Sequence, residues 1–339
     1  MTQQLTQRYL PALDALMRQL VASVSLPDAE DFGTMLRYPL GWVDEHNQPA
    51  NHSTGKRIRP LLLLLSTEAV GGNWNTALPA AAAVELLHNF SLIHDDIQDD
   101  SPTRRGRATV WMIWGRANAI NGGDALFALA YTALQQLALN NVNPKIILAA
   151  WEIFNRTNLE LTRGQHLDMR FEHQESVSVD EYISMITGKS AALVSACAQM
   201  GALIGSGDEA TAAHFADFGR NLGIAFQIRD DILGIWGDPD VTGKSAATDI
   251  LSRKKTIPVL YGLSQSEQLR SIYQSESFGL AQVEEAVHLL DSLHAQEYTL
   301  ERERAYYHQA MQSLELANPQ GAAAQGLAAL TESLFQRQA

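Results

Sequence analysis

The chain has 339 residues, of which 46% are hydrophobic and 19% charged, so it can bury a large core and is not disordered. Its 25 Lys and Arg against 38 Asp and Glu give a net charge of −13, which argues against a nucleic-acid binder. Cys197 is the only cysteine, which excludes an intrachain disulfide and fits a reducing cytoplasm. The first ten residues lack a signal-peptide apolar region, and the run Leu61–Leu65 is far shorter than the ~20 residues of a bilayer span. We therefore expect a soluble cytoplasmic protein without a transmembrane segment.

Helical spacing of apolar residues dominates the chain. A stripe from Leu5 to Val24 predicts an N-terminal helix, and further helical patterns follow along the sequence. These patterns cover Pro79–Phe90, Ala125–Leu139, Lys145–Leu161, Val179–Ile204 and Ala210–Leu233. Alternating strand patterns are hard to find, so the sequence predicts an all-α bundle of roughly ten or more helices, given a mean helix length of ~11–12 residues. No long flexible linker is evident, and we expect one domain over residues 1–339.

Two apolar segments end in aspartate clusters, LIHDDIQDD at 92–100 and FQIRDDIL at 226–233. Adjacent carboxylates repel each other most where apolar neighbours lower the dielectric, so both clusters suggest bound cations. Oxygen ligands with few His or Cys nearby favour Mg²⁺, which usually also binds substrate phosphates. Asp95 and Asp99 have helical spacing that stacks them ~5–6 Å apart on one face. An isolated pattern of this kind is more often a solvated helix end. The apolar segment that precedes these aspartates and the presence of the second cluster favour metal binding.

Two basic clusters accompany these aspartates. The sequence GKRIRP at 55–60 gives Lys56 and Arg59 a shared helix face if a helix begins there, and RRGR follows at 104–107. The planar guanidinium of Arg can bind two phosphate oxygens at once, and the flexible side chain of Lys supplies a mobile point charge. Each cluster alone could be solvent-facing charge. Cations beside carboxylates in an acidic chain are better explained by a site for metal and diphosphate.

The motifs, in their order, resemble those of the trans-isoprenyl diphosphate synthases, the polyprenyl synthetase family. They are GKRIRP, LIHDDIQDD, RRG, GQHLD, TGKS, FQIRDD and GKSAATDI, between about Gly55 and Pro258. The resemblance implies an α-helical fold around a deep central cavity, usually as a homodimer. It also implies Mg²⁺-dependent head-to-tail condensation of an allylic diphosphate with isopentenyl diphosphate, with three ions bound alongside the diphosphate.

The resemblance also implies roles for individual residues. Asp95 and Asp99 resemble the principal metal ligands with Asp96 in support, and Asp230 resembles the ligand of the remaining ion with Asp231 nearby. The isopentenyl diphosphate site would comprise Lys56, Arg59, His88 and Arg105. The allylic diphosphate would lie among Arg104, Lys189, Ser190 and Lys244, with Gln227 beside its reacting end and Gln165 and Asp168 as a polar pair near the cavity.

Two positions depart from the family pattern. Gly234 stands where many relatives complete a second D-D-x-x-D motif with aspartate, and Asp238 follows four residues later. Ser190 stands where Thr often follows the lysine, so the hydroxyl is kept and a methyl is lost. Because Asp230 and Asp231 remain, we expect an active enzyme.

Product length should depend on what closes the cavity below the metals. Phe90 lies five residues before Asp95, ~7.5 Å along the helix axis, with small Ser91 beside it and Leu87 one further turn away. The combination of an aromatic residue at this position and no insertion between Asp96 and Asp99 most resembles the pattern of geranylgeranyl diphosphate synthases.

Three alternatives remain open on the sequence. The product could be farnesyl diphosphate or a longer polyprenyl diphosphate. The chain could be a class I terpene cyclase, although that enzyme would not need the cations for isopentenyl diphosphate. It could also be a non-catalytic regulatory subunit of a heteromeric synthase, against which the nearly intact site argues.

Overall fold

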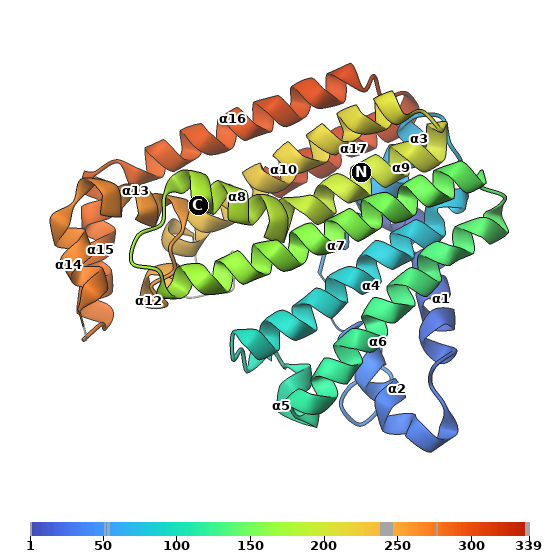
Figure 1. Cartoon of the computed structure of the whole chain (residues 1–339), viewed down its shortest axis with the longest axis horizontal. Helices are drawn as coiled ribbons and strands as arrows, with labels where there is room; N and C mark the ends of the chain where they lie inside the picture. The colour runs from blue at the N-terminus through green and yellow to red at the C-terminus, as the bar shows by residue number, and fades with distance from the viewer. Residues whose placement is uncertain (1, 51, 53–54, 238–246, 276, 336–339) are drawn as a thin grey trace. The chain divides into compact units, whose positions relative to one another are not determined.

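The computed structural model describes residues 2–50, 52, 55–237, 247–275 and 277–335, and it is almost entirely helical (Figure 1). The predicted all-α class is confirmed. By their backbone contacts these residues form two compact units. Unit 1 holds residues up to Trp151 with Met200–Asp208 and Gln320–Gly326, and unit 2 holds Glu152–Gln199, Glu209–Pro319 and the residues from Leu327. The expectation of a single domain with a central cavity stays a prediction.

Unit 1 is built around one long helix that is apolar on all sides. Its elements are α1 (Thr2–Ala22), a 3₁₀ turn at Pro27–Ala29, α2 (Glu30–Arg37), α3 (Ile58–Ala69), α4 (Trp74–Gln98), β1 (Thr103–Arg104), β2 (Arg107–Ala108), α5 (Val110–Trp114), α6 (Arg116–Gln135), a 3₁₀ turn at Gln136–Asn140 and the first residues of α7 (Pro144–His173). Helix α4 packs against α3, α6 and α1. Its alanines 80–83 are fully buried, and their small side chains let neighbouring helices approach closely. Although α4 is long and apolar enough to cross a membrane, 72% of its most apolar window is buried, as in a core helix.

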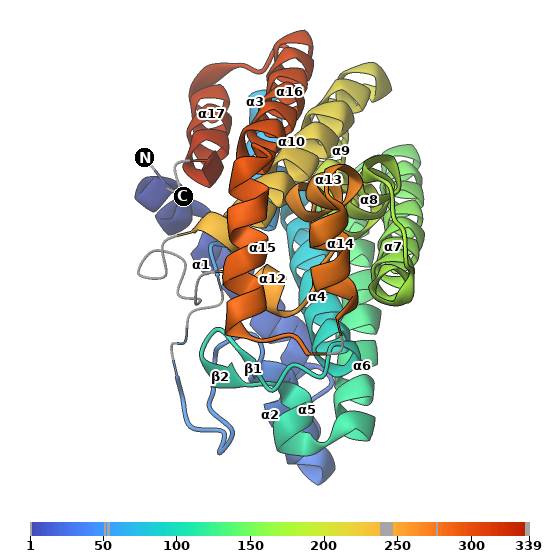
Figure 2. The same cartoon turned by 90° about the vertical axis from the view of Figure 1, so that its left-hand side faces the viewer.

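Unit 2 is organised by α10 (Glu209–Trp236), which packs against α16 (Ala295–Leu316) along its length (Figures 1 and 2). Its other elements are most of α7, α8 (Val179–Ile186), a π-helical turn at Thr187–Ala191, most of α9 (Ala192–Ser206), α12 (Thr248–Leu251), α13 (Ile257–Gln265), α14 (Glu267–Gln274), α15 (Leu280–Ser292) and the end of α17 (Gly321–Phe335). One apolar cluster joins α8, α10 and α13 around Ile228, and a second joins α12 to α15 around Ile250. Helix α10 is thus fixed on several sides.

The predicted helices are present, with two differences in detail. The apolar pattern over Val179–Ile204 predicts one helix, whereas a π-helical turn interrupts it at Thr187–Ala191. The conditional helical pairing of Lys56 with Arg59 is wrong, because α3 begins at Ile58, after Arg57, whose backbone is left-handed with φ 47°. Lys56 therefore lies on the loop before α3, and Arg59 lies in the first turn of α3.

Candidate active site

The first aspartate motif forms the end of α4. The helix continues to Gln98, and Asp99 caps it, with the Asp99 N–H donating to the Asp95 carbonyl at 2.8 Å. Asp95 and Asp99 thus lie one turn apart, as predicted, and Asp99 is exposed while Asp95 is half-buried. Both are placed to bind a ligand that approaches the end of the helix.

Asp96 differs from its neighbours because it points into unit 1. Its side chain is buried. Oδ1 accepts a hydrogen bond from Arg104 Nε at 2.8 Å and forms an ion pair with Arg104 NH2, also at 2.8 Å. Burial raises the pKa of Asp96, the contacts with Arg104 lower it, and the charge of Asp99 raises it. Asp96 therefore ties Arg104 to α4, which fits the supporting role that the resemblance implies.

Arg104 and Arg105 belong to a β-hairpin that the sequence did not predict. Thr103 pairs with Ala108 and Arg104 with Arg107, and the turn is Arg105–Gly106. Both turn residues have positive φ, 53° and 74°, as in the type I′ turn that suits two-residue hairpins. The turn places the Arg105 guanidinium beside Gly55, where an added Cβ would lie 2.9 Å from the Arg105 NH2 atom.

Basic groups from α3, α4 and the hairpin converge near a buried carboxylate. Arg59 NH1 lies 3.3 Å from Nε2 of His88, and Arg57 Nε lies 3.9 Å from Oε1 of Glu85. Burial, and then the charges of Arg59, Arg105 and Arg104, hold the pKa of His88 well below its ordinary value, so His88 is neutral at pH 7. Positive charge therefore exceeds negative charge here, which suits an anion such as a diphosphate. Lys56 is exposed on the loop before α3.

The candidate chain-length residue Phe90 lies against α6. Its ring centroid is 4.6 Å from that of His94 and 5.0 Å from that of Phe127, which in turn lies 5.2 Å from Tyr131. Ser91 is buried and donates to the His88 carbonyl at 2.9 Å, and Leu87 is fully buried. Phe127 was not predictable from the sequence, because contact between α4 and α6 has no signature within either helix.

In unit 2, the second aspartate pair also divides into one half-buried and one buried residue. Asp230 is half-buried, whereas Asp231 is 2% exposed. The Tyr182 hydroxyl donates to both oxygens of Asp231, at 2.9 and 2.8 Å, and Gln227 Nε2 donates to Oδ1 at 3.1 Å. Burial raises the pKa of Asp231 to about 7, although Tyr182, Gln227 and the charge of Lys254 act to lower it. Asp231 therefore joins α8 to α10, and Asp230 is the better placed of the two to meet a ligand.

The π-helical turn presents the predicted residues Lys189 and Ser190. Ser190 Oγ donates to Gln227 Oε1 at 2.7 Å, and the Lys189 ammonium pairs with Asp168 on α7. The turn sits directly on α7, because an added Cβ at Gly164 would lie 2.1 Å from the Lys189 backbone nitrogen. π-Helical turns are frequent at functional sites. Gln165, the other member of the predicted polar pair, is buried on α7.

Three further residues complete the comparison with the sequence. Lys244 and Asp238 lie outside the described residues. Lys254 was not predicted, yet its charge reaches Asp231; the basic run Arg253–Lys255 was the available signal. Arg229, inside the second motif, pairs instead with buried Glu303 of α16 at 2.9 Å and so serves packing.

The carboxylates fit a hard cation that keeps other ligands. Within the part of the chain that the structure describes, no group of three or more His, Cys, Asp or Glu side chains is arranged to hold a metal ion. Mg²⁺ commonly binds through one or two carboxylates and takes its remaining oxygens from water and substrate phosphate. Asp95 and Asp99 in unit 1, and Asp230 in unit 2, match that kind of donor set.

Comparisons with known proteins agree with this reading. The sequence matches the Polyprenyl synthetase family over residues 42–290. It is 41% identical over 261 residues to the (2E,6E)-farnesyl diphosphate synthase of Mycobacterium tuberculosis, covering 76% of this chain and 71% of that protein. It is 44% identical over 250 residues to the geranylgeranyl diphosphate synthase of the same organism, covering 73% and 70%. The crystal structure of geranylgeranyl pyrophosphate synthetase from Pyrococcus horikoshii superposes with a TM-score of 0.88 at 33% identity, over 99% of this chain and 98% of that one.

The fold and these matches define an isoprenoid synthase of the all-α type. The chain belongs to the polyprenyl synthetase family, as the motifs indicated. It is accordingly an enzyme, a short-chain trans-prenyltransferase.

Proposed function

We propose that this enzyme condenses isopentenyl diphosphate head-to-tail with allylic diphosphates and releases geranylgeranyl diphosphate. The observation that carries the proposal lies within unit 1, where α4 bears both the accessible carboxylates Asp95 and Asp99 and, two turns earlier, neutral His88 of the basic cluster with Arg59 and Arg105. Such a surface suits metal-bound and metal-free diphosphate groups side by side. The relatives named for farnesyl and geranylgeranyl products make farnesyl diphosphate the main competing product.

Each substrate is assigned its own cations. Lys56, Arg59, His88 and Arg105 bind the diphosphate of isopentenyl diphosphate, and neutral His88 donates or accepts a hydrogen bond without adding charge. Arg104, Lys189 and Lys244 bind the allylic diphosphate, with Ser190 and Gln227 beside its reacting end. Donors fixed in place before the reaction stabilise charge as it develops on the leaving diphosphate.

Mg²⁺ belongs to this proposal, with Asp95, Asp99 and Asp230 as the residues that hold it and Asp96 in support. When bound, it neutralises charge on the diphosphate that leaves the allylic carbon. The protein's own part is to orient both substrates and to exclude water from the allylic cation through apolar walls. The isopentenyl double bond attacks that cation, and the proton lost afterwards goes to the released diphosphate.

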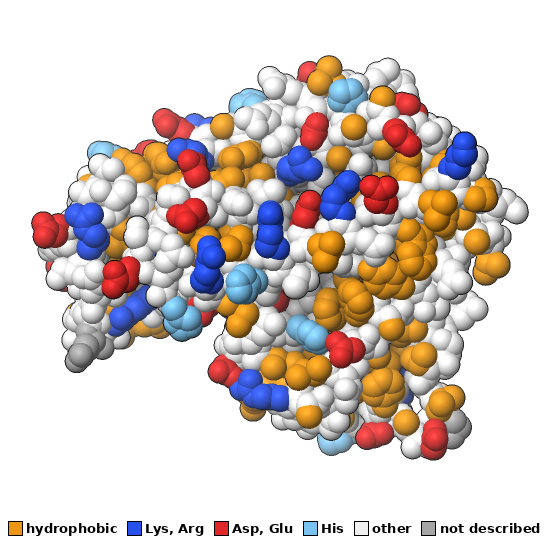
Figure 3. All heavy atoms as spheres, viewed as in Figure 1, with side chains coloured by type: hydrophobic (Ala, Val, Ile, Leu, Met, Phe, Trp, Pro, Cys, Tyr) orange, Lys and Arg blue, Asp and Glu red, His pale blue; other side chains and the backbone are white. Residues whose placement is uncertain are grey.

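We also propose a cytoplasmic homodimer. Leu148 and Leu159 of α7 are 71% and 73% exposed. Large apolar side chains that gather on one face mark a surface for association. On the face shown in Figure 3, hydrophobic side chains gather in patches, while acidic and basic ones are interspersed elsewhere.

The test is product analysis with the purified chain. Labelled isopentenyl diphosphate is supplied with dimethylallyl, geranyl or farnesyl diphosphate and Mg²⁺, and products are identified by mass spectrometry. We expect geranylgeranyl diphosphate from each primer and almost no product from Asp95→Ala, because one lost stabiliser of the leaving group can cost ~10²–10³-fold in rate. Cyclic hydrocarbons without incorporated label would indicate a terpene cyclase, and inactivity of the chain by itself would indicate a regulatory subunit.

A further inference from the structure

The hairpin that carries Arg104 and Arg105 cannot hold itself in place. Each strand has two residues, and even longer isolated two-stranded hairpins are marginal in water. Packing on α4 is incomplete, because a cavity of about 50 Å³ lies beside it. Its lining includes Tyr38, Leu92, Ile93, Asp96, Arg104 and Val110. Other contacts must therefore fix the hairpin.

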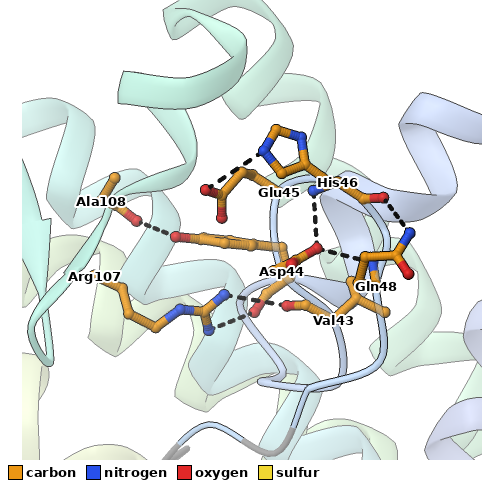
Figure 4. A network of polar contacts seen from close by, with 8 residues as sticks. Val43, Asp44, Glu45, His46, Gln48, Arg107 and Ala108 are labelled. Carbon is orange, nitrogen blue, oxygen red and sulfur yellow. Dashed lines mark hydrogen bonds and ion pairs between the residues drawn. The ribbon is translucent and has the colours of Figure 1, made fainter.

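Arg107 on β2 makes those contacts with the segment that follows α2. Its NH1 donates to the Tyr38 carbonyl at 3.2 Å and its NH2 donates to the Val43 carbonyl at 3.1 Å. The guanidinium also lies 3.8 Å from the centre of the Tyr38 ring. In return, the Tyr38 hydroxyl donates to the Ala108 carbonyl at 2.8 Å (Figure 4). The two segments thus hold each other through three hydrogen bonds and one ring contact.

The segment that receives Arg107 is itself well fixed. The Asp44 carboxylate accepts from the backbone N–H groups of His46 at 3.0 Å and Gln48 at 2.8 Å (Figure 4). Val43 forms a β-bridge with Pro49, and the Tyr38 ring packs edge-on against Trp114 at 5.3 Å. Arg107 therefore attaches the hairpin to a folded surface.

The pairing of the two strands links Arg107 directly to Arg104 and, through the turn, to Arg105. Arg107 is the direct cross-strand partner of Arg104, whose guanidinium binds Asp96, and the turn between the two carries Arg105. The guanidinium of Arg107 is occupied by two carbonyls and a ring, unlike that of a phosphate-binding residue. We propose that Arg107, with Tyr38, is a positioning residue that sets the place of Arg105, and hence the affinity of the site for diphosphate. This inference rests on the proposed function.

The test separates positioning from folding through a split between KM and kcat. Arg107→Met keeps the length of the side chain and removes the charge and both donors. We expect the KM for isopentenyl diphosphate to rise ~10-fold with kcat within about twofold, since a displaced binding group weakens substrate and transition state alike. Arg107→Lys keeps a cation over the ring and one donor, so it should recover part of the loss. Tyr38→Phe removes only the bond to Ala108 and should show a smaller rise.

Arg8→Met is the matched control. Arg8 also lies over a tyrosine ring, that of Tyr9 at 5.2 Å, and pairs with Glu68, so its loss removes similar interactions from unit 1 without touching the hairpin. Its KM should stay at the wild-type value. An unchanged KM in Arg107→Met, or an equal change in Arg8→Met, overturns the inference. If Arg107→Met does not fold, Arg107→Lys and Tyr38→Phe decide the question by the same comparison.

The same variants also test the inference if the proposed reaction fails. Should the wild type incorporate no labelled isopentenyl diphosphate, the proposed function is wrong. Calorimetric binding of inorganic pyrophosphate without metal then replaces KM as the measurement. A ~10-fold weaker affinity in Arg107→Met than in Arg8→Met supports positioning by Arg107, and equal affinities overturn it.

Discussion

The Asp249 carboxylate of α12 occupies the space that a side chain at Gly234 of α10 would need. A Cβ added at Gly234 would lie 2.1 Å from Asp249 Oδ2. Gly234 is one helical turn beyond Asp230, at the last position of the D-D-x-x-D pattern that the resemblance implies. The departure noted in the sequence therefore has a structural counterpart, because α12 packs where that aspartate would stand.

Gly234→Ala should therefore destabilise the protein. An alanine usually stabilises the middle of a helix by ~1 kcal/mol over glycine, but here the clash should reverse the sign and cost roughly 1–3 kcal/mol. Urea denaturation measures the free energy of unfolding. Gly279→Ala is the control, since its added Cβ would meet nothing closer than Gln282 Oε1 at 3.7 Å. In an Asp249→Ala background the penalty should vanish; a penalty that persists there contradicts the assigned clash.

Asp231→Asn should change how stability depends on pH. The pKa of Asp231 is raised to about 7, so the folded protein keeps a proton that the unfolded chain releases at lower pH. The stability from this carboxyl is fully present below its unfolded pKa near 3.9 and is lost as pH rises through 7. The unfolding free energy of wild type minus variant should fall between pH 5 and pH 8, measured without Mg²⁺. Asp217→Asn, at an exposed position of the same helix, is the control, and a flat difference for Asp231→Asn would show the assignment to be wrong.

Arg59→Ala should chiefly weaken binding of isopentenyl diphosphate. It removes a guanidinium that lies beside His88 and whose charge lowers the pKa of the buried Glu85 carboxyl. A lost charge-assisted contact costs ~1.5–3 kcal/mol, which corresponds to a rise in KM of about 10-fold or more. Lys189→Ala provides the reciprocal comparison, with the larger effect on the allylic substrate. If Arg59→Ala raised only the allylic KM, the two sites would have been assigned in reverse.

Phe90→Ala should lengthen the product. Removing the ring that packs on Phe127 opens space below Asp95, and each methylene buried there gains ~0.8 kcal/mol. Mass spectrometry of the products should show longer prenyl chains while the first condensation persists. Adding Leu87→Ala should extend them further. Should a folded and active Phe90→Ala enzyme keep the wild-type product, Phe90 would not be the barrier; a loss of ~3–5 kcal/mol in stability would instead mark it as a core residue.

The helices were predictable because their apolar spacing repeats over many residues. The pattern Ala210–Leu233 differs from α10, Glu209–Trp236, by only a few residues at each end. The hairpin was not predictable, since strands of two residues are too short to show alternation. The π-helical turn was also invisible, because it changes one hydrogen-bond register without changing the apolar pattern.

For the candidate site, residue identity was easier to predict than orientation. Neighbouring residues on a helix point ~100° apart, so each Asp-Asp pair has one member near solvent and one that can turn inward. Asp96 and Asp231 are the buried members, bound to Arg104 and Tyr182. Neither partner is adjacent in sequence, so the spacing within the motifs could not distinguish ligand from support.

The π-helical turn at Thr187–Ala191 makes this stretch sensitive to length. A π turn holds one residue more than an α turn, and each residue rotates a helix by ~100°. Because the π turn takes up its extra residue with little net rotation, deleting one residue and restoring α geometry would leave Tyr182 of α8 facing Asp231. The deletion would instead narrow the turn that presents Lys189 to Asp168 and Ser190 to Gln227. The number of residues in this turn is therefore constrained by the polar contacts of the turn itself.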